Sequence, residues 1–480
     1  MEFEPVIGLE VHCQLKTVTK LFAVATTGFG AEPNTQVDTV TLGLPGVLPV
    51  LNARAVELAI RAAIIVGGDV RPRSTFARKH YFYPDLPKGY QISQFDEPYC
   101  VGGGVTIDLE DGTTRVIPLT RIHMEEDAGK LVHQERGPWS EVDLNRAGTP
   151  LIEIVTDPAI RSAAEAYAYL FELKRALQWA GVGDCELQEG SLRCDANVSV
   201  RPVGTHKLGT KVEVKNLNSF RAVEAAITYE ITSQIALHRA GRAAEIVQCT
   251  KLWDPDTKTT RIMRTKEDAA DYRYFPDPDL PPLEVSSAQV AAIRADLPEM
   301  PRVLEERWMS EYGFARSVAR ELTTDRAVAD YVAGLIAVGC KPQLAANWTR
   351  EEALRLAAER HLPLGEAAPV PVMAALIRLI EAGKVARVVA KSECTELFAS
   401  GAEPEAYFTA KGMIQVQDAG QLSAWVAQAI AAEPKAVADV RAGKLAAAGR
   451  LVGATMKLAG GKADPGQART EVAKQLGVPL

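Results

Sequence analysis

The first strong pattern in the chain is a two-residue alternation of apolar and polar positions near its start. From Ile7 to Leu15 every second residue is apolar, and the positions between them include Glu10, His12 and Gln14. Successive side chains of a β-strand point to opposite faces, so Glu10 and His12 would be neighbours on one face. The alternation predicts a strand with a buried apolar face, and the Glu-x-His pair indicates metal binding on the other face.

The stretch 121–130 shows the same alternation with more polar groups. Arg121, His123, Glu125 and Asp127 would share one face of a strand. Taken alone, this stretch would be an exposed acidic strand end. Because other strands repeat the arrangement, we interpret it as a face that binds a hard cation, with Arg121 placed to hold a phosphate.

A further strand, 151–156, carries an acidic residue inside an apolar run. Glu153 lies between Ile152 and Ile154. Burying a lone carboxylate costs roughly several kcal/mol unless the carboxylate is paired or bound to a metal ion. We therefore expect Glu153 to belong to a functional or structural polar network.

Two more alternating stretches, 188–200 and 211–219, extend this polar face. Their polar positions include Arg193, Asp195, Asn197 and Ser199 in the first and Lys211, Glu213 and Lys215 in the second. Antiparallel sheets commonly keep one face on the core and leave the other open. An open face that carries carboxylates, amides and cations suits a site for Mg²⁺ and a nucleotide.

The stretch 78–91 combines aromatic and basic residues. Its two prolines and one glycine predict an irregular loop. Lys79, Tyr81 and Lys88 offer cations and a ring that could contact a phosphate or a nucleotide. A rigid structural loop explains the same composition, and both interpretations stay open.

Local signals place helices and a turn in this part of the chain. Asn52 is expected to cap a helix over 53–66, and Ser162 a helix that ends at Gly181. The run Gly102–Gly104 predicts a hairpin turn.

Past residue 282 the pattern changes to helical spacing, with capping boxes expected at Ser286 and Thr349. We therefore predict an α+β protein. It begins with a largely antiparallel β-sheet cradle domain with flanking helices, which is followed by an all-α domain and a small helical tail. The expected domains are residues 1–292, 293–404 and 405–480.

Composition and charge limit the class of protein. The chain has no run of about 18 apolar residues, so no membrane-spanning segment is expected. The N-terminus lacks an apolar signal core and the seven cysteines form no Cys-x-x-Cys pair, which together favour a cytoplasmic location. A net charge of −7 excludes a generally basic nucleic-acid coat.

The last 80 residues differ in charge, with nine Lys and Arg against seven Asp and Glu. A basic cluster within them contains Arg441, Lys444, Arg450, Lys457 and Lys462. Such a cluster could contact an RNA backbone, and a solvated helical face explains it as well.

Eight stretches together carry a resemblance to a known family. They are 7–15, 43–52, 79–94, 123–130, 145–156, 189–200, 215–220 and 271–280. In this order they resemble the B-subunit family of the glutamyl/aspartyl-tRNA amidotransferases along essentially the whole chain. The resemblance implies an ATP-dependent protein that phosphorylates the side-chain carboxylate of mischarged Glu-tRNA(Gln) or Asp-tRNA(Asn). Ammonia then displaces the phosphate.

The same resemblance implies partners and cofactors. ATP and Mg²⁺ would be the cofactors, an amidase partner (the A subunit of such enzymes) would release ammonia from glutamine, and a small C subunit would brace the pair. The tail is similar to the YqeY fold, which in this family contacts tRNA(Gln) or tRNA(Asn). The chain itself shows no nucleophile-plus-base set for glutamine hydrolysis.

Within this resemblance we assign roles to the residues of the polar face. The metal ligands are expected to be Glu10, His12, Glu125 and Glu153. The nucleotide is expected to contact Asp195, Asn197, Arg193 and Lys215. Glu10, Glu125, Lys79, Tyr81 and Lys88 are expected to act in catalysis, the last three by holding phosphate or guiding ammonia.

Two departures from the family pattern affect these expectations. Many relatives carry two pairs of cysteines where this chain has Ala23, Ala25, Asp38 and Thr41. Zinc is not expected there, because no thiolate remains to bind it. The family's Gln-Glu-Thr-Arg run reads 248–251 Gln-Cys-Thr-Lys here, so the Glu and Arg of that run are replaced by Cys249 and Lys251.

Two other functions remain as alternatives at this stage. A non-catalytic scaffold with a structural metal would bind tRNA without ATP turnover. A free-standing metallohydrolase would act without any partner chain.

Overall fold

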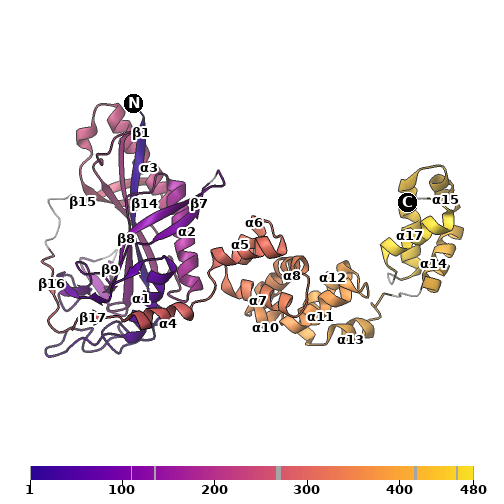
Figure 1. The fold of residues 1–480 in the computed structure, drawn as a ribbon, viewed down its shortest axis with the longest axis horizontal. Helices are drawn as coiled ribbons and strands as arrows, with labels where there is room; N and C mark the ends of the chain where they lie inside the picture. The colour runs from indigo at the N-terminus through magenta and orange to yellow at the C-terminus, as the bar shows by residue number, and fades with distance from the viewer. Residues whose placement is uncertain are drawn as a thin grey trace. The chain divides into compact units, whose positions relative to one another are not determined.

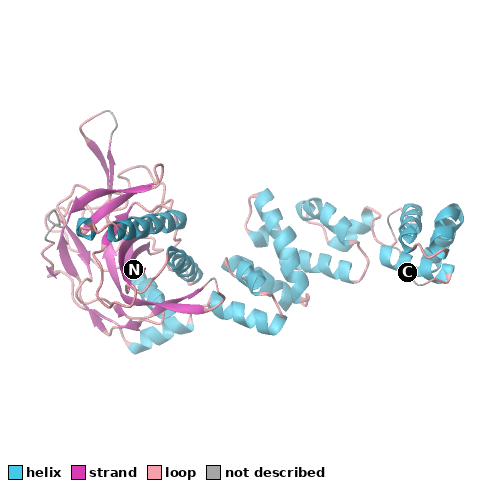
Figure 2. Cartoon of the chain, turned by 90° about the horizontal axis from the view of Figure 1, so that it is seen from above, coloured by secondary structure: helices cyan, strands magenta, loops and turns pink. Residues whose placement is uncertain are grey.

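The computed structural model describes residues 2–109, 111–133, 137–265, 272–415, 419–460 and 463–478. The chain forms two compact units, Met1–Pro301 and Arg302–Leu480. All strands of the described residues lie in the first unit, and the second unit is helical (Figure 1; Figure 2). The predicted α+β class is confirmed, whereas a further boundary at residue 404 stays a prediction. Asp271, which begins the last family-like stretch, and Lys462 of the basic cluster lie outside the described residues.

A 13-stranded sheet organises the first unit. Strand β1 (Phe3–Gln14) pairs antiparallel with β11 (Pro150–Thr156) on one side and with β12 (Leu192–Pro202) on the other. Strand β11 also pairs with β8 (Thr114–Glu126), and β12 also pairs with β13 (Val212–Lys215). The five stretches with polar faces are therefore adjacent strands of one sheet.

The remaining strands extend this sheet and form two small ladders. The main path runs β15-β14-β13-β12-β1-β11-β8-β5-β4-β16, and its pair β13–β14 is parallel. The bounds are β2 Asp69–Val70, β3 Arg73–Ser74, β4 Ala77–His80, β5 Tyr90–Ser93, β6 Cys100–Val101, β7 Gly104–Asp108, β9 Lys130–His133, β10 Ser140–Asp143, β14 Cys249–Asp254, β15 Thr259–Thr265, β16 Phe275–Pro276 and β17 Leu283–Glu284.

Helices cover the apolar face of the sheet. Helices α1 (Ala53–Ile65), α2 (Ala163–Trp179) and α3 (Phe220–Arg239) share one core with the apolar side chains of the strands. The predicted caps are confirmed, because the side chains of Asn52 and Ser162 accept backbone N–H groups of the first turns. A slip of one residue would exchange the two faces of a strand, so this core fixes which side chains face the open side.

The glycine run at 102–104 is not a hairpin turn. Strands β6 and β7 both pair with β8, β6 at Ile122 and β7 at Pro118, so the glycines link two segments that follow the same partner. Gly103 has φ of 89°, and a Cβ atom there would lie 2.7 Å from the carbonyl oxygen of Val66. Glycine is needed because the backbone passes directly against the end of α1.

The helices near and beyond the unit boundary follow one another with short connections. They are α4 Ser287–Ala295, α5 Pro301–Tyr312, α6 Arg316–Leu322, α7 Arg326–Ala337, α8 Pro342–Trp348, η3 Thr349–Ala353, α9 Leu354–Arg360, α10 Leu364–Ala367, α11 Val370–Glu381, α12 Arg387–Ser400, α13 Pro404–Ala410, α14 Ala419–Ala432, α15 Pro434–Arg441, η4 Leu445–Ala447, α16 Ala448–Leu458 and α17 Pro465–Leu476. The short 3₁₀ helix η1 (Ala243–Glu245) follows α3 in the first unit. None of the described helices has the length and apolar content needed to cross a membrane.

One of the two predicted capping boxes is confirmed and the other is wrong. Ser286 and Gln289 exchange the two expected hydrogen bonds at the start of α4. Thr349 instead lies within a helical run that continues from α8 through the π-helical turn η3, and its hydroxyl donates to the carbonyl oxygen of Ala345 at 2.7 Å. The helix has already begun at Pro342, so there is no free first turn at Thr349 to cap.

Asp38 organises the segment where many relatives carry cysteines. Its carboxylate accepts the backbone N–H groups of Val24 and Ala25 at 3.0 Å each and of Thr41 at 2.8 Å. Burial alone would raise the pKa of Asp38, but these hydrogen bonds and nearby Lys20 hold it below its usual value. A charged carboxylate at position 38 therefore ties together the backbone at Val24, Ala25 and Thr41.

We expect Asp38→Ala to destabilise the first unit by about 1–3 kcal/mol, because three backbone donors lose a charged acceptor. Asp38→Asn is the matched control, since it keeps one acceptor oxygen and should lose less. Thermal unfolding of both variants measures the difference. An unchanged midpoint for Asp38→Ala would show that this segment is held by other contacts.

Candidate active site

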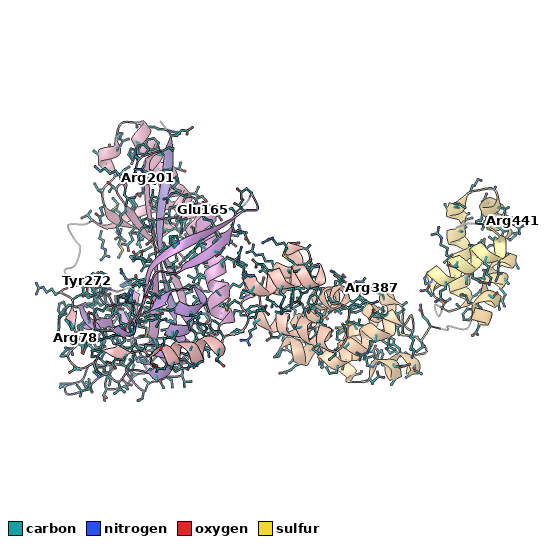
Figure 3. The ribbon with its side chains drawn as sticks, viewed as in Figure 1. Arg78, Glu165, Arg201, Tyr272, Arg387 and Arg441 are labelled. Atoms are coloured by element: carbon teal, nitrogen blue, oxygen red, sulfur yellow. The ribbon has the colours of Figure 1, made fainter. Side chains whose placement is uncertain are left out.

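The open face of the sheet contains a cavity of about 420 Å³. His12, Glu125 and Glu153 form its acidic wall, and Lys79 and Tyr81 contribute from the segment that includes β4. Tyr272, which is labelled in Figure 3, also lines it. The structure thus brings together eight of the residues assigned from the sequence, since Arg193, Asp195 and Lys215 line the cavity as well.

Strand register creates the first group of candidate metal ligands. His12 lies opposite Glu153, and Glu153 lies opposite His123 on β8. The His12 Nε2 atom is 3.4 Å from Glu153 Oε2 and 3.7 Å from Glu125 Oε1. One ligand atom from each of His12, Glu125 and Glu153 lies within 4.8 Å of the others, so this first cluster can bind a metal ion.

His123 on β8 contacts both carboxylates of the first cluster. It was not among the metal ligands assigned from the sequence. Its Nε2 atom lies 3.3 Å from Glu153 Oε2 and 3.7 Å from Glu125 Oε2. Its Nδ1 atom is buried and has no hydrogen-bond partner among the described residues. The alternation at 121–127 already placed His123 beside Glu125, but only the register showed that it also contacts Glu153.

In the first cluster, the charges of the carboxylates and the neighbouring imidazoles balance one another. Burial lowers the pKa of His123, but its contacts with Glu125 and Glu153 outweigh burial and raise it to about 9. Burial would raise the pKa of Glu153, yet the two imidazoles lower it well below its usual value. Without a metal ion, protonated imidazoles offset the two carboxylates. A divalent cation would supply the same positive charge, which fits metal binding here.

Glu10 belongs to a second group, separate from His12. Glu10, Asp195 and Glu213 place one carboxylate oxygen each within 4.8 Å of one another. The sequence placed Glu10 and His12 in one ligand set because they share a strand face. Residues two apart on a strand are about 6.6 Å apart, so each joins different neighbours across the sheet.

Polar neighbours hold this second cluster in place. Asn197 Nδ2 donates to Glu10 Oε1 at 2.9 Å. Lys215 forms ion pairs with Asp195 and, at 3.0 Å, with Glu213 Oε1. Burial, followed by the charge of Glu153, raises the pKa of Glu10. A positive group, either a metal ion or a proton, is therefore favoured beside Glu10.

A smaller cavity of about 200 Å³ adjoins the second cluster. Glu10, Asn197 and Glu213 line it, together with Thr250 and Tyr272. Thr250 Oγ1 donates to Glu213 Oε2 at 2.6 Å. Glu213 and Thr250 were not assigned from the sequence, although the alternation at 211–215 had placed Glu213 on the polar face.

Two cations assigned from the sequence have other partners. Arg193 lines the large cavity, and its Nη2 atom lies 2.8 Å from Asp127 Oδ2, a pairing that raises the pKa of the guanidinium despite burial. Lys88 does not line that cavity, because it forms a buried ion pair with Glu126 on the other side of β8. The structure therefore separates Lys88 from Lys79 and Tyr81.

Tyr81 is suited to donate a hydrogen bond. Burial, with Asp85 and two nearby tyrosines, raises the pKa of its phenol to about 12. It therefore stays protonated near neutral pH. Together with Lys79, it places one donor and one cation beside the acidic first cluster.

Comparison with known proteins identifies the family. The model of the GatB/GatE catalytic domain matches residues 5–291, and that of the GatB domain matches residues 330–476. A protein of Thermosynechococcus vestitus, named as the B subunit of an aspartyl/glutamyl-tRNA(Asn/Gln) amidotransferase, is 49% identical over 99% of this chain and 97% of its own length. This chain belongs to the amidotransferase B-subunit family.

Other members of the B-subunit family are equally similar along the whole chain. The protein of the same name from Cupriavidus metallidurans is 48% identical over 99% of this chain and all of its own length. That from Moorella thermoacetica is 48% identical over 97% of this chain and 98% of its own. Both clusters lie within the region matched by the catalytic domain of the B-subunit family.

Proposed function

We propose that this chain phosphorylates the side-chain carboxylate of mischarged Glu-tRNA(Gln), Asp-tRNA(Asn) or both with ATP, so that ammonia can convert it to the amide. The observation that carries this proposal is the first cluster, a partly buried set of potential metal ligands beside Lys79 and Tyr81 in one cavity. The names of the relatives supply the class of substrate, a tRNA that accepts Asn or Gln.

Phosphorylation solves the chemical problem of making an amide from a carboxylate. The carboxylate oxygen attacks the γ-phosphorus of ATP, and ADP leaves with the electrons of the broken P–O bond. Ammonia then attacks the acyl carbon, the C–O bond to phosphate breaks, and one proton is lost from nitrogen. Positioning and neutralisation of the phosphoryl oxygens contribute most of the rate increase.

The described residues fit Mg²⁺ as the cation of the nucleotide. The second cluster offers three carboxylates, the ligands that Mg²⁺ prefers, and the first offers two carboxylates and an imidazole, which also suits Mn²⁺ or Zn²⁺. A bound divalent ion would neutralise charge on the phosphoryl group. Lys79 and Tyr81 would hold phosphoryl oxygens at the other wall of the cavity.

The proposed partner chains supply glutamine hydrolysis, for which we find no nucleophile-plus-base set in the sequence. We propose that an amidase partner releases ammonia from glutamine and that a small third chain completes the complex. Because the relatives are named as one lettered subunit of an amidotransferase, their names support an assembly of several chains. Since water would hydrolyse the acyl phosphate, ammonia should reach the cavity by an enclosed path.

Mg²⁺-dependent ATP hydrolysis tests this function. The complex receives mischarged Glu-tRNA(Gln) and Asp-tRNA(Asn) in separate reactions, with the uncharged tRNAs as controls. We expect phosphate release only with a mischarged tRNA. A scaffold would bind tRNA without turnover, and a free-standing hydrolase would release phosphate without tRNA or partner.

The basic helices of the tail are proposed to contact the tRNA backbone. The core of the tail runs from Leu422 to Leu476, whereas α13 packs against α11 and buries Phe408 completely. Truncation after Gln415 therefore removes the tail and spares the core around α13. We expect weaker tRNA binding with a smaller salt dependence, and unchanged ATP binding. Unchanged tRNA affinity would leave the basic cluster as a solvated face.

A further inference from the structure

A row of aromatic side chains borders the large cavity. It consists of Tyr83, Tyr81, Tyr272, Tyr274 and Phe95, and is called the aromatic row below. Tyr81 and Tyr83 are stacked, with ring centroids 5.2 Å apart, and Phe95 and Tyr274 are stacked at 4.7 Å. Tyr81 and Tyr272 both line the cavity, and Tyr272 lies edge-on to Tyr274 with ring centroids 6.2 Å apart.

Sheet pairing holds the aromatic row beside the cavity. Strand β4 carries Lys79 opposite Gln91 of β5, and both side chains line the cavity. The backbone N–H of His80 donates to the carbonyl oxygen of Tyr272 at 2.9 Å, which fixes the segment before β16 against β4. Phe95 follows β5, whose Ser93 lies opposite Glu125. The rings thus lie next to β4, β5 and β16, and β5 pairs with β8, the strand that carries Glu125 of the first cluster.

Both ends of the aromatic row are open. Tyr83 is 58% exposed and Phe95 is 41% exposed, so each stacked pair has one ring that is partly open to solvent. An exposed ring that is already stacked on a partner loses little entropy when a further flat ring stacks on it. The exposed pairs are therefore suited to flat, aromatic ligands.

Two cations contact these rings, and neither is paired with a carboxylate in the part of the chain that the structure describes. The Lys79 Nζ atom lies 4.8 Å from the centroid of the Tyr272 ring, and the Arg121 Cζ atom lies 4.8 Å from that of Phe95. Neither forms an ion pair with the described residues, and Arg121 Nε is buried without a hydrogen-bond partner there. Arg193 and Lys215 on the same face are both paired with carboxylates. Among the described residues, Arg121 thus has no anionic partner and can contact a phosphate, whereas Lys79 faces the cavity.

We infer that the aromatic row is the stacking surface for the unpaired nucleotides at the 3′ end of the aminoacyl-tRNA, with Arg121 contacting a phosphate of that end. This inference rests on the proposed function, because the amino acid is esterified to the last ribose of that end. Alternating rings and cations are what single-stranded nucleic acid requires, and stacking tolerates any base. Two exposed stacked pairs can receive more than one base, whereas ATP has a single base.

Fluorescence of a tRNA labelled at its 3′ end tests the inference. The probe is tRNA(Gln) with 2-aminopurine in place of the terminal adenine, titrated with the full chain in its complex. Stacking on the aromatic row should quench the label. Phe95→Leu combined with Tyr83→Leu should weaken binding roughly 5- to 150-fold for each base that loses its ring. The single variant Phe95→Tyr keeps an aromatic ring at this position, so it should show most of the quenching seen with the wild type.

The matched control removes an aromatic ring from the same loop but outside the row. Phe82 is 81% exposed and lies beside His80, so Phe82→Leu should change neither affinity nor quenching. A tRNA that lacks its unpaired 3′ nucleotides should bind the wild type and the double variant equally. Thermal unfolding confirms that each variant is folded.

Three results would overturn the inference. The double variant could bind the labelled tRNA as well as the wild type. It could lose ATP affinity and keep tRNA affinity, which would assign the rings to the base of ATP. It could lose only its partner chains, which would make the row a protein interface. A wild type that quenches the label but never hydrolyses ATP would instead refute the proposed function and leave the stacking surface intact.

Discussion

Replacing Glu125 with glutamine should leave the first unit folded and reduce ATP-dependent transamidation on the order of 10³-fold. Glutamine keeps the shape of the side chain and an acceptor oxygen for His12 and His123. It removes one of the two negative charges that would bind a cation at the first cluster. Calorimetric titration with Mg²⁺ or Mn²⁺ should show weaker binding in the same variant.

The control for this substitution is Glu97→Gln. Glu97 is an exposed acid after β5 whose contact is a hydrogen bond from Thr75, outside both clusters. Its activity should stay within about twofold of the wild type, as is usual for surface substitutions. Normal kinetics and an unchanged metal titration in Glu125→Gln would refute the assignment of the first cluster.

The isolated chain, given ATP, Mg²⁺ and mischarged tRNA, should form amide from free ammonium and none from glutamine. Glutamine hydrolysis needs an activated nucleophile, and all seven cysteines of this chain are buried. Burial raises the pKa of the thiols of Cys100, Cys194, Cys249, Cys340 and Cys394, which keeps them protonated and unreactive. Adding the amidase partner should restore the use of glutamine.

Glutamine labelled with ¹⁵N at its amide is the substrate that checks this division of labour. Mass spectrometry of the amino acid released from tRNA shows whether the label has been transferred. Label transferred by the single chain would reveal a glutaminase site that the structure does not indicate. The ammonium reaction, run alongside, shows that the same preparation is able to form the amide.

Periodicity predicted the strands well, because alternation along a strand depends only on local geometry. Ile7, Leu9, Val11 and Cys13 are all buried, as the alternation of β1 requires. Helix starts at Asn52 and Ser162 were also predictable, since a capping side chain bonds within its own first turn. The capping-box pattern at Thr349 did not mark a helix start, because it falls inside a helical run that has already begun.

Which side chains meet in each cluster depends on the pairing register of the strands, and a single sequence does not specify that register. The pairing of β1 with β11 places Glu153 beside His12, whereas the pairing with β12 places Asp195 beside Glu10. This difference separates two residues that the alternation had grouped. The prediction that Lys88 acts beside Lys79 and Tyr81 was not met for a similar reason. Lys88 pairs with Glu126 on the opposite side of β8, a long-range contact that the sequence does not show.

In the proposed mechanism, the first cluster activates a carboxylate by phosphorylation. Glu-tRNA(Gln) labelled with ¹⁸O in its side-chain carboxylate tests it most directly, by mass spectrometry of the phosphate released during amide formation. If the carboxylate attacks the γ-phosphorus, one carboxylate oxygen leaves with phosphate, so each phosphate should contain one ¹⁸O. The transfer should require a divalent metal ion and disappear in Glu125→Gln. Amide formation with unlabelled phosphate would contradict the account.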